Sequence, residues 1–411
     1  MNRFRKKIII SFGAFVVILT GLLVYIAHSN NFISLSDTEE IKIAISVPLA
    51  GTAGASIKNS IELAFGEVNY TIDDFKVELL VLDGGDETGA WSDEIEKNNA
   101  ETAAADPDVL AYMGTYNSGA AKISIPILNR ANIVQISPAN TWPGLTKTGF
   151  APGEPGIFYP TGQRNYFRVC TTDDNQGPAG AIWANELGFS SVYVIDDGEA
   201  YGVGVAGLFK RKALSIGIDV VGNSTLSDEP RSRREILDKV KQHEPDLIYY
   251  GGTTPGGIAP FLQEIDALEI DVKIMGPDGI AGQDFIDLVG VDIAEGVYAT
   301  TIGVSALNID REEAYRFNEL YSSTYGSDAG PFAVLAYESA QVLIAALKKV
   351  DGKKDRLAVL EAVRDTKNFH SLLDNWSFDD AGDTDLVLMS GSKVVGGAFV
   401  FIKDLQTPLT N

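Results

Sequence analysis

The chain has little cysteine, histidine or positive charge, and each shortage excludes a kind of function. Its 411 residues include one cysteine, Cys170, and three histidines, His28, His243 and His370. One cysteine excludes an intrachain disulfide, and no spacing of Cys and His predicts a metal site. We therefore expect Cys170 to be a small buried side chain rather than a reactive thiol.

Acidic residues outnumber basic ones by 56 to 33, so the net charge is −23, and it becomes −27 without residues 1–29. Such a surface repels nucleic acid and anionic lipid headgroups, which excludes nucleic-acid binding. We interpret the acidity as a solvated surface rather than as a feature of a site. A hydrophobic content of 45% predicts a folded protein, and the length allows two cores.

The amino terminus predicts export. Four positive residues in Met1–Lys7 precede Ile8–Ala27, a mainly apolar segment without charge. This pattern is typical of a signal peptide or a membrane anchor, and it predicts that everything after it is translocated. Twenty residues favour an anchor, whereas Ala27-His28-Ser29 is an acceptable cleavage site. We expect 1–29 to be signal or anchor, 30–40 a linker, and the rest extracytoplasmic.

Beyond residue 40, short apolar runs alternate with segments of helical periodicity. Ile41–Val47 and Val109–Met113 are expected strands, and Asp93–Ala105 and Arg231–His243 are expected helices. Continuous apolar strands that alternate with helices indicate an α/β fold with parallel sheets covered on both faces. The Pro/Gly-rich stretch 143–164 has no periodicity and is a natural place to leave a first sheet.

Two expected strands end in small polar turns. Val109–Met113 leads to Asn117-Ser118-Gly119, and 133–136 leads to Ser137-Pro138-Ala139-Asn140-Thr141. Open α/β sheets bind small ligands at the carboxyl ends of their strands. A helix that begins at Ser118 would direct free N–H groups and a positive dipole end there, which suits a carboxylate.

At these segments the chain resembles the leucine/isoleucine/valine-binding proteins, amino-acid receptors of type I periplasmic binding protein fold that serve ABC importers. The resemblance extends over roughly residues 40 to 403 and depends on the order and spacing of several motifs. These are IKIAISVPLAG (41–51), MGTYNSG (113–119), QISPANT (135–141), YGVG (201–204), YYGG (249–252), MGPDG (275–279) and FDDAGD (378–383).

The resemblance implies two Rossmann-like lobes joined by three hinge crossovers, near Asp173, Thr301 and Trp376. Lobe 1 would contain 41–173 plus 302–375, and lobe 2 would contain 174–301 plus 376–405. Such lobes close around a small ligand, here an amino acid, and present it to ABC permease subunits. Neither catalysis nor a cofactor is implied. An alternative is a sensory ligand-binding domain anchored by residues 8–27.

The resemblance also implies six ligand-binding residues, three from each lobe. They are Ser118, Ala139 and Thr141 for the carboxylate side, and Tyr201, Thr253 and Asp278 for the opposite wall. A carboxylate at 278 suits an ammonium, which offers three donors and a charge. Structural explanations stay open, because Ser118 suits a helix cap and Pro-Asp-Gly a turn. Thr253 stands where leucine-type receptors carry an aromatic hydroxyl, so branched-chain specificity is not implied.

Three patterns that are typical of enzymes or nucleotide sites lack their usual context. Ser118 has neither a positioned base nor a G-x-S-x-G turn. Gly202–Gly207 satisfies G-x-G-x-x-G, but the acidic loop 196–201 separates it from its strand, so we interpret it as a chance match. Ser390–Lys393 satisfies S-x-x-K, and we expect a hairpin turn there between two apolar strands.

Overall fold

The computed structural model describes residues 38–227 and 229–406. The expected signal or anchor, 1–29, and most of the linker lie outside these residues. The described residues from Glu40 onward belong to a single compact unit. Among the described residues, no helix combines the length and apolar character that crossing a membrane requires.

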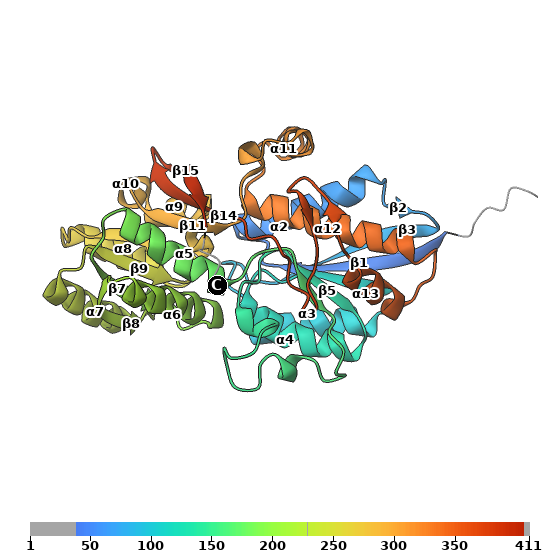
Figure 1. The fold of residues 1–411 in the computed structure, drawn as a ribbon, viewed down its shortest axis with the longest axis horizontal. Helices are drawn as coiled ribbons and strands as arrows, with labels where there is room; N and C mark the ends of the chain where they lie inside the picture. The colour runs from blue at the N-terminus through green and yellow to red at the C-terminus, as the bar shows by residue number, and fades with distance from the viewer. Residues whose placement is uncertain (1–37, 228, 407–411) are drawn as a thin grey trace, which may run out of the picture. The chain divides into compact units, whose positions relative to one another are not determined.

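The first of two large sheets has six strands and is mostly parallel (Figure 1). Its strands are β1 (Glu39–Val47), β2 (Thr71–Ile72), β3 (Phe75–Asp83), β4 (Val109–Gly114), β5 (Val134–Ser137) and β6 (Tyr166–Arg168). The order is β2-β3-β1-β4-β5-β6, in which β1, β4, β5 and β6 run parallel. Its helices are α2 (Thr52–Glu67), α3 (Asp93–Ala105), α4 (Ser118–Arg130), α11 (Glu312–Tyr325), α12 (Pro331–Lys349) and α13 (Arg356–Arg364). We call this sheet and these helices the first lobe.

The second sheet has seven strands, and the next-to-last strand in the sequence runs antiparallel to both of its neighbours. Its strands are β7 (Ser191–Asp196), β8 (Asp219–Thr225), β9 (Leu247–Gly251), β10 (Lys273–Gly276), β11 (Tyr298–Ile302), β14 (Met389–Val395) and β15 (Ala398–Leu405), in the order β15-β14-β11-β10-β9-β7-β8. Its helices are α5 (Asp173–Glu186), α6 (Ala200–Ser215), α7 (Pro230–His243), α8 (Ile258–Ala267), α9 (Gln283–Val289) and α10 (Val291–Ala294). We call this part the second lobe.

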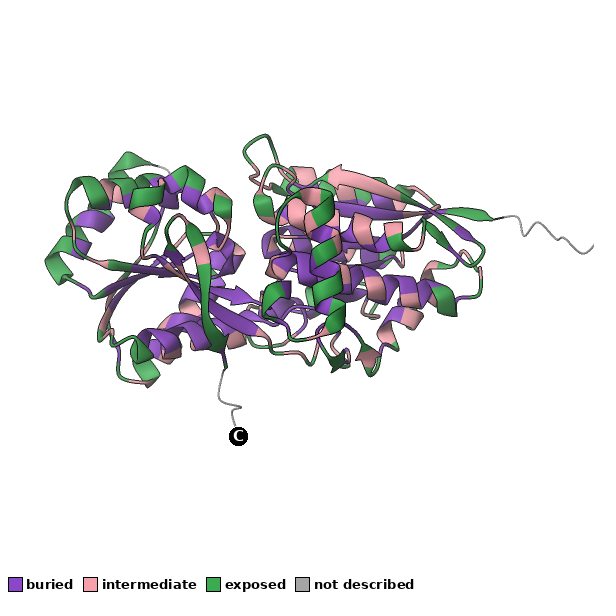
Figure 2. Cartoon of the chain, turned by 90° about the horizontal axis from the view of Figure 1, so that it is seen from above, coloured by how far each residue is buried: buried purple, intermediate pink, exposed green. Residues whose placement is uncertain are grey.

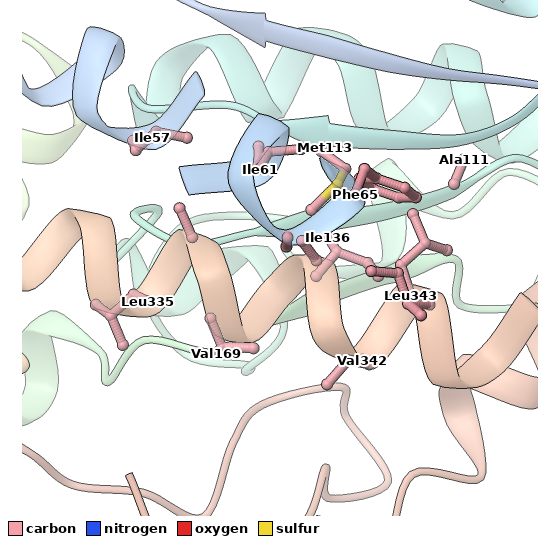
Figure 3. Close-up of a cluster of buried hydrophobic side chains, with 14 of the residues drawn as sticks. Ile57, Ile61, Phe65, Ala111, Met113, Ile136, Val169, Leu335, Val342 and Leu343 are labelled. Carbon is pink, nitrogen blue, oxygen red and sulfur yellow. The ribbon is translucent and has the colours of Figure 1, made fainter. Parts of the chain in front are cut away.

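Burial explains why the strands are continuously apolar. The central strands are buried on both faces, and exposed residues gather on the outer sides of the helices (Figure 2). In the first lobe, Ile61 and Phe65 of α2 share a core with Met113 of β4 and with Leu335 and Leu343 of α12 (Figure 3). Helices from opposite ends of the chain, α2 and α12, therefore pack side by side.

The chain passes between the lobes three times. It leaves the first lobe between Arg168 and Asp173, and it returns after β11. A third passage was expected near Trp376, but Trp376 and Phe378 are buried in the core of the first lobe. The next strand of the second lobe begins only at Met389. A short hairpin of β12 (Phe369–His370) and β13 (Asn375–Trp376) precedes this passage.

The prediction of a hairpin turn at Ser390–Lys393 is wrong. These residues lie inside β14, between β11 and β15, and the turn falls at Gly396-Gly397, where φ is +60° and +82°. The Ser390 hydroxyl donates to the carbonyl oxygen of Gly303. The S-x-x-K pattern is therefore part of a buried strand.

Candidate functional site

Five of the six predicted site residues line one small cavity. Ser118 and Ala139 come from the first lobe, and Tyr201, Thr253 and Asp278 come from the second. Tyr116 and Asn117, which were not predicted, complete the lining. We call this space the inner cavity. The sixth residue, Thr141, is buried but does not line it.

The first-lobe wall is formed where β4 turns into α4. Gly114 ends β4 with φ +136°, and a Cβ there would lie 2.3 Å from the Ser46 carbonyl oxygen, so only glycine fits. Helix α4 begins at Ser118, as predicted, with Asn117 at the cap position. The Ser118 hydroxyl oxygen accepts a hydrogen bond from the Trp142 N–H at 3.2 Å. The positive end of the α4 dipole therefore faces the cavity, which favours an anion there.

The Ser137–Thr141 turn offers the cavity fewer free donors than expected. The Ala139 N–H already donates to the Ser137 hydroxyl at 3.1 Å, so its carbonyl oxygen is the group left to a ligand. Behind it, Thr141 is 1% exposed, and its Oγ1 has no hydrogen-bond partner among the described residues. The Thr141 carbonyl oxygen accepts from the Asp173 N–H at 2.9 Å.

A fully buried arginine positions this turn. The Nη1 of Arg168 donates to the carbonyl oxygens of Asn140 and Trp142, at 3.0 and 2.8 Å, and its Nε donates to Asp383 Oδ1 at 2.7 Å. Burial alone lowers the pKa of Arg168, but the Asp383 carboxylate outweighs burial and leaves the pKa raised. Arg168 was not predicted from the sequence, where its only signal is Asp383 in the FDDAGD motif.

On the second-lobe wall, Tyr201 and Asp278 form a hydrogen-bonded pair. The Tyr201 hydroxyl donates to Asp278 Oδ1 at 2.6 Å, and the Gly279 N–H donates to the same hydroxyl at 3.3 Å. Burial raises the pKa of Asp278 to about 6, against the lowering effect of the Tyr201 hydrogen bond. The wall opposite the α4 terminus thus carries a carboxylate, which suits a cation.

A second buried acid, Asp173, lies behind this wall at the start of α5. It is 0% exposed, and neither carboxylate oxygen has a hydrogen-bond partner among the described residues. Burial, and next the charge of Asp278, raise the pKa of Asp173 well above its ordinary value. The Gln176 Oε1 and the Tyr249 hydroxyl are also buried without a partner. None of these groups lines either cavity, and Thr141 and Gln176 lie close enough to Asp173 and Asp278, respectively, to lower the pKa of each acid against the effect of burial.

An outer cavity continues from the inner one and shares Tyr116, Asn117 and Thr253 with it. Its empty space is about 1690 Å³, part of it open solvent. Both lobes form its wall. The first lobe contributes Trp91, and the second contributes the apolar Leu226 and Leu288 and all three acids, Asp197, Glu199 and Asp284. Across the lobes, the Thr52 hydroxyl donates to Asp284 Oδ1 at 2.7 Å.

The G-x-G-x-x-G glycines lie inside α6, where packing explains two of them. A Cβ at Gly202 would lie 2.5 Å from the Gly251 carbonyl oxygen, and a Cβ at Gly204 would lie 2.4 Å from Trp142 Cζ3. The glycines therefore allow close approach rather than hold a phosphate. Neither His243 nor His370 lines the two cavities. Among the described residues, no group of three or more His, Cys, Asp or Glu is arranged to hold a metal ion.

Two mainly parallel α/β lobes, joined by three chain passages, define the type I periplasmic binding protein fold. The sequence profile of the family described as "Periplasmic binding protein" matches residues 40–387. The chain belongs to this family.

Relatives with known names cover most of the chain. It is 25% identical over 349 residues to the Leu/Ile/Val-binding protein BraC3 of Rhizobium johnstonii, with 84% of this chain and 89% of that protein aligned. The leucine-binding protein LivK of Thermotoga maritima superposes with a TM-score of 0.77 at 26% identity, over 89% and 99% of the two chains. A solute-binding protein of an ABC transporter from R. palustris, solved with benzoate, shares the fold at 19% identity and a TM-score of 0.72, over 90% and 97%.

Proposed function

We propose that the protein is the extracytoplasmic solute-binding protein of an ABC importer and closes its two lobes on an amino acid or related small ligand. The observation that carries this proposal is the convergence of Ser118 and Ala139 with Tyr201 and Asp278 on one cavity. A helix terminus that favours anions stands on one wall and a carboxylate on the other. This polarity suits a zwitterion, with its carboxylate near Ser118 and its ammonium near Asp278. The names of the relatives make leucine, isoleucine and valine the first ligands to test.

Closure is the proposed mechanism. The Thr52–Asp284 hydrogen bond and the packing of Trp142 on Gly204 join the two lobes. A ligand that contacts both walls adds interactions that exist only in the closed form, so it shifts the population toward that form. We propose lobe boundaries at the three passages described above, with the third placed between Thr384 and Met389. The closed form would be the one that the permease recognises.

A ligand screen with matched variants tests the binding site. Purified protein is heated with single amino acids, amides and small carboxylic acids, and a ligand that binds the folded state raises the melting temperature. We expect Ser118→Ala and Asp278→Asn to reduce the shift, while Ser323→Ala on the outer face of α11 and Asp287→Asn on α9 leave it unchanged. A shift that neither site substitution weakens would place the ligand elsewhere, and the absence of any shift would contradict the proposal.

An uptake assay tests the importer role. Cells that lack the gene should lose uptake of the radiolabelled ligand found in the screen, and the wild-type gene should restore it. The Asp278→Asn gene should not restore uptake, because its product would bind the ligand weakly. Unchanged uptake in the deletion strain would contradict an importer and favour the anchored sensory receptor.

A further inference from the structure

We propose that the ligand of this cleft carries a net positive charge, and that its second cationic group lies in the outer cavity beside the second-lobe acids that line it. The inference rests on the proposed function and names the ligand class of that site. The class is an amino acid or amine with a second positive group, such as a basic amino acid.

The charges that line the two cavities are all of one sign. Asp278 lines the inner cavity, and Asp197, Glu199 and Asp284 line the outer one. Among the described residues, no Lys, Arg or His lines either cavity. A neutral amino acid has one ammonium, for which Asp278 is sufficient. With such a ligand, the carboxylates of the outer cavity would have no positive partner, because the walls of that cavity supply none.

One of these acids, Glu199, also lies near an acid of the first lobe. Burial raises the pKa of Glu199, on the second lobe, and the charge of Asp93 on α3 of the first lobe raises it further. The Asp284 carboxylate reaches Thr52 on α2. Closure thus brings negative groups of both lobes together. A cation between them would replace repulsion with attraction, and the effect is larger in a partly buried cleft than in water.

An unpartnered buried acceptor provides a second, independent observation. Asn117 lines both cavities, and its buried Oδ1 has no hydrogen-bond partner among the described residues. It stands at the junction as a free acceptor for an N–H donor.

The outer cavity has the surface that a basic side chain requires. Such a side chain has an apolar stem and a charged end, and it packs the stem on apolar groups while the end reaches polar ones. The stem can pack on Trp91, Leu226 and Leu288. The charged end can reach the carboxylates of Asp197 and Asp284. A lysine-like ligand can thus keep its α-groups in the inner cavity and extend its side chain outward.

The test compares ligands that match in shape and differ in charge. Isothermal titration measures the affinity of lysine against norleucine, and of arginine against citrulline, with leucine as a further neutral ligand. We expect the basic member of at least one pair to bind at least tenfold more tightly. The affinity of that basic ligand should also fall more with added salt than that of its neutral partner.

Variants then locate the second charge. Asp284→Asn keeps an acceptor for Thr52, and Glu199→Gln keeps the side-chain length, so neither should disturb the fold. Each should weaken the basic ligand several-fold more than it weakens the neutral one. Asp287→Asn, on the same helix as Asp284 but outside both cavities, should change neither affinity.

The outcomes separate this inference from the proposed function. Leucine or norleucine binding as tightly as lysine, with citrulline matching arginine, would overturn the inference and leave the proposed function standing. A preference for basic ligands that survives both substitutions would also overturn it, because the second charge would then lie elsewhere. No binding of any amino acid would reject the proposed function itself.

Discussion

Trp142 of the first lobe packs on Gly204 of α6 so closely that a Cβ at position 204 would lie 2.4 Å from Trp142 Cζ3. We expect Gly204→Ala to disfavour the closed form by about 1–3 kcal/mol, because the indole has to move. Ligand affinity should then fall about tenfold in isothermal titration, although alanine is the better helix former.

Gly207→Ala is the control for this substitution. It lies on the same helix, and the nearest atom to its added Cβ would be Arg211 Nη1 at 3.7 Å, which is ordinary contact. Its affinity should match that of the wild type. Equal affinities for both variants would contradict a role of the Trp142 contact in closure.

Breaking the buried ion pair should destabilise the first lobe. Asp383→Asn leaves the Arg168 guanidinium buried without its counter-charge, so the free energy of unfolding should fall by about 3–5 kcal/mol. Urea unfolding measures it. Glu235→Gln breaks the exposed pair with Arg231 and should cost no more than about 0.5 kcal/mol. A comparable effect of both substitutions would argue against an essential Arg168–Asp383 pair.

The protein should become less stable as the pH rises from about 4.5 to 7. Burial raises the pKa of Glu96 from 4.5 to about 7, so the folded state holds a proton that the unfolded state has lost. Stability therefore falls in this window, by up to about 1.4 kcal/mol per pH unit for this group, and is flat above it.

Glu96→Gln should remove this contribution, because the Ser46 and Tyr112 hydroxyls that bond Glu96 can also bond an amide. The variant should melt at a higher temperature than the wild type at pH 7.5, and its melting temperature should depend less on pH. Glu94→Gln, an exposed neighbour on α3, should behave like the wild type. A Glu96→Gln variant with unchanged pH dependence would refute this assignment.

Ligand affinity should weaken in acid. The pKa of Asp278 is about 6, so below that pH the carboxylate becomes protonated and no longer attracts an ammonium. We expect affinity to fall by up to about tenfold per pH unit below pH 6 and to vary little above it. Titrations between pH 5 and 8 check this. Asp278→Asn should bind weakly at every pH, and a variant that kept the acid-side loss would assign it to another group.

Local sequence was sufficient for the strands and for the turns that end them. Buried parallel strands have to be apolar on both faces, so runs such as Val109–Met113 could be located directly. The chemistry of MGTYNSG and MGPDG placed Ser118 and Asp278 at strand ends, where the structure brings them to one cavity. Tyr116 and Asn117 lay inside a recognised motif, yet their place in the wall depends on the second lobe.

Residues whose environment is made by distant segments could not be predicted. The partner of Arg168 lies 215 residues away, and the burial of Asp173 results from packing between α5, α6 and β11. The polar residues of Ser390–Lys393 suggested a turn, but the segment pairs with β11 and β15, and its Gly391 lies against Trp183. A Cβ at Gly391 would lie 2.9 Å from Trp183 Cη2.

The long sequence separation of Arg168 and Asp383 has a consequence for biosynthesis. Strands β7 to β11 have all left the ribosome while Asp383 is still unmade, so the central sheet of the second lobe can assemble early. The first lobe, although its strands come first, lacks α12 and the counter-charge for Arg168 until nearly the whole polypeptide has been translated. In nascent chains that stop short of residue 383, strands β7 to β11 should therefore be ordered, while the N-terminal region is still accessible to protease.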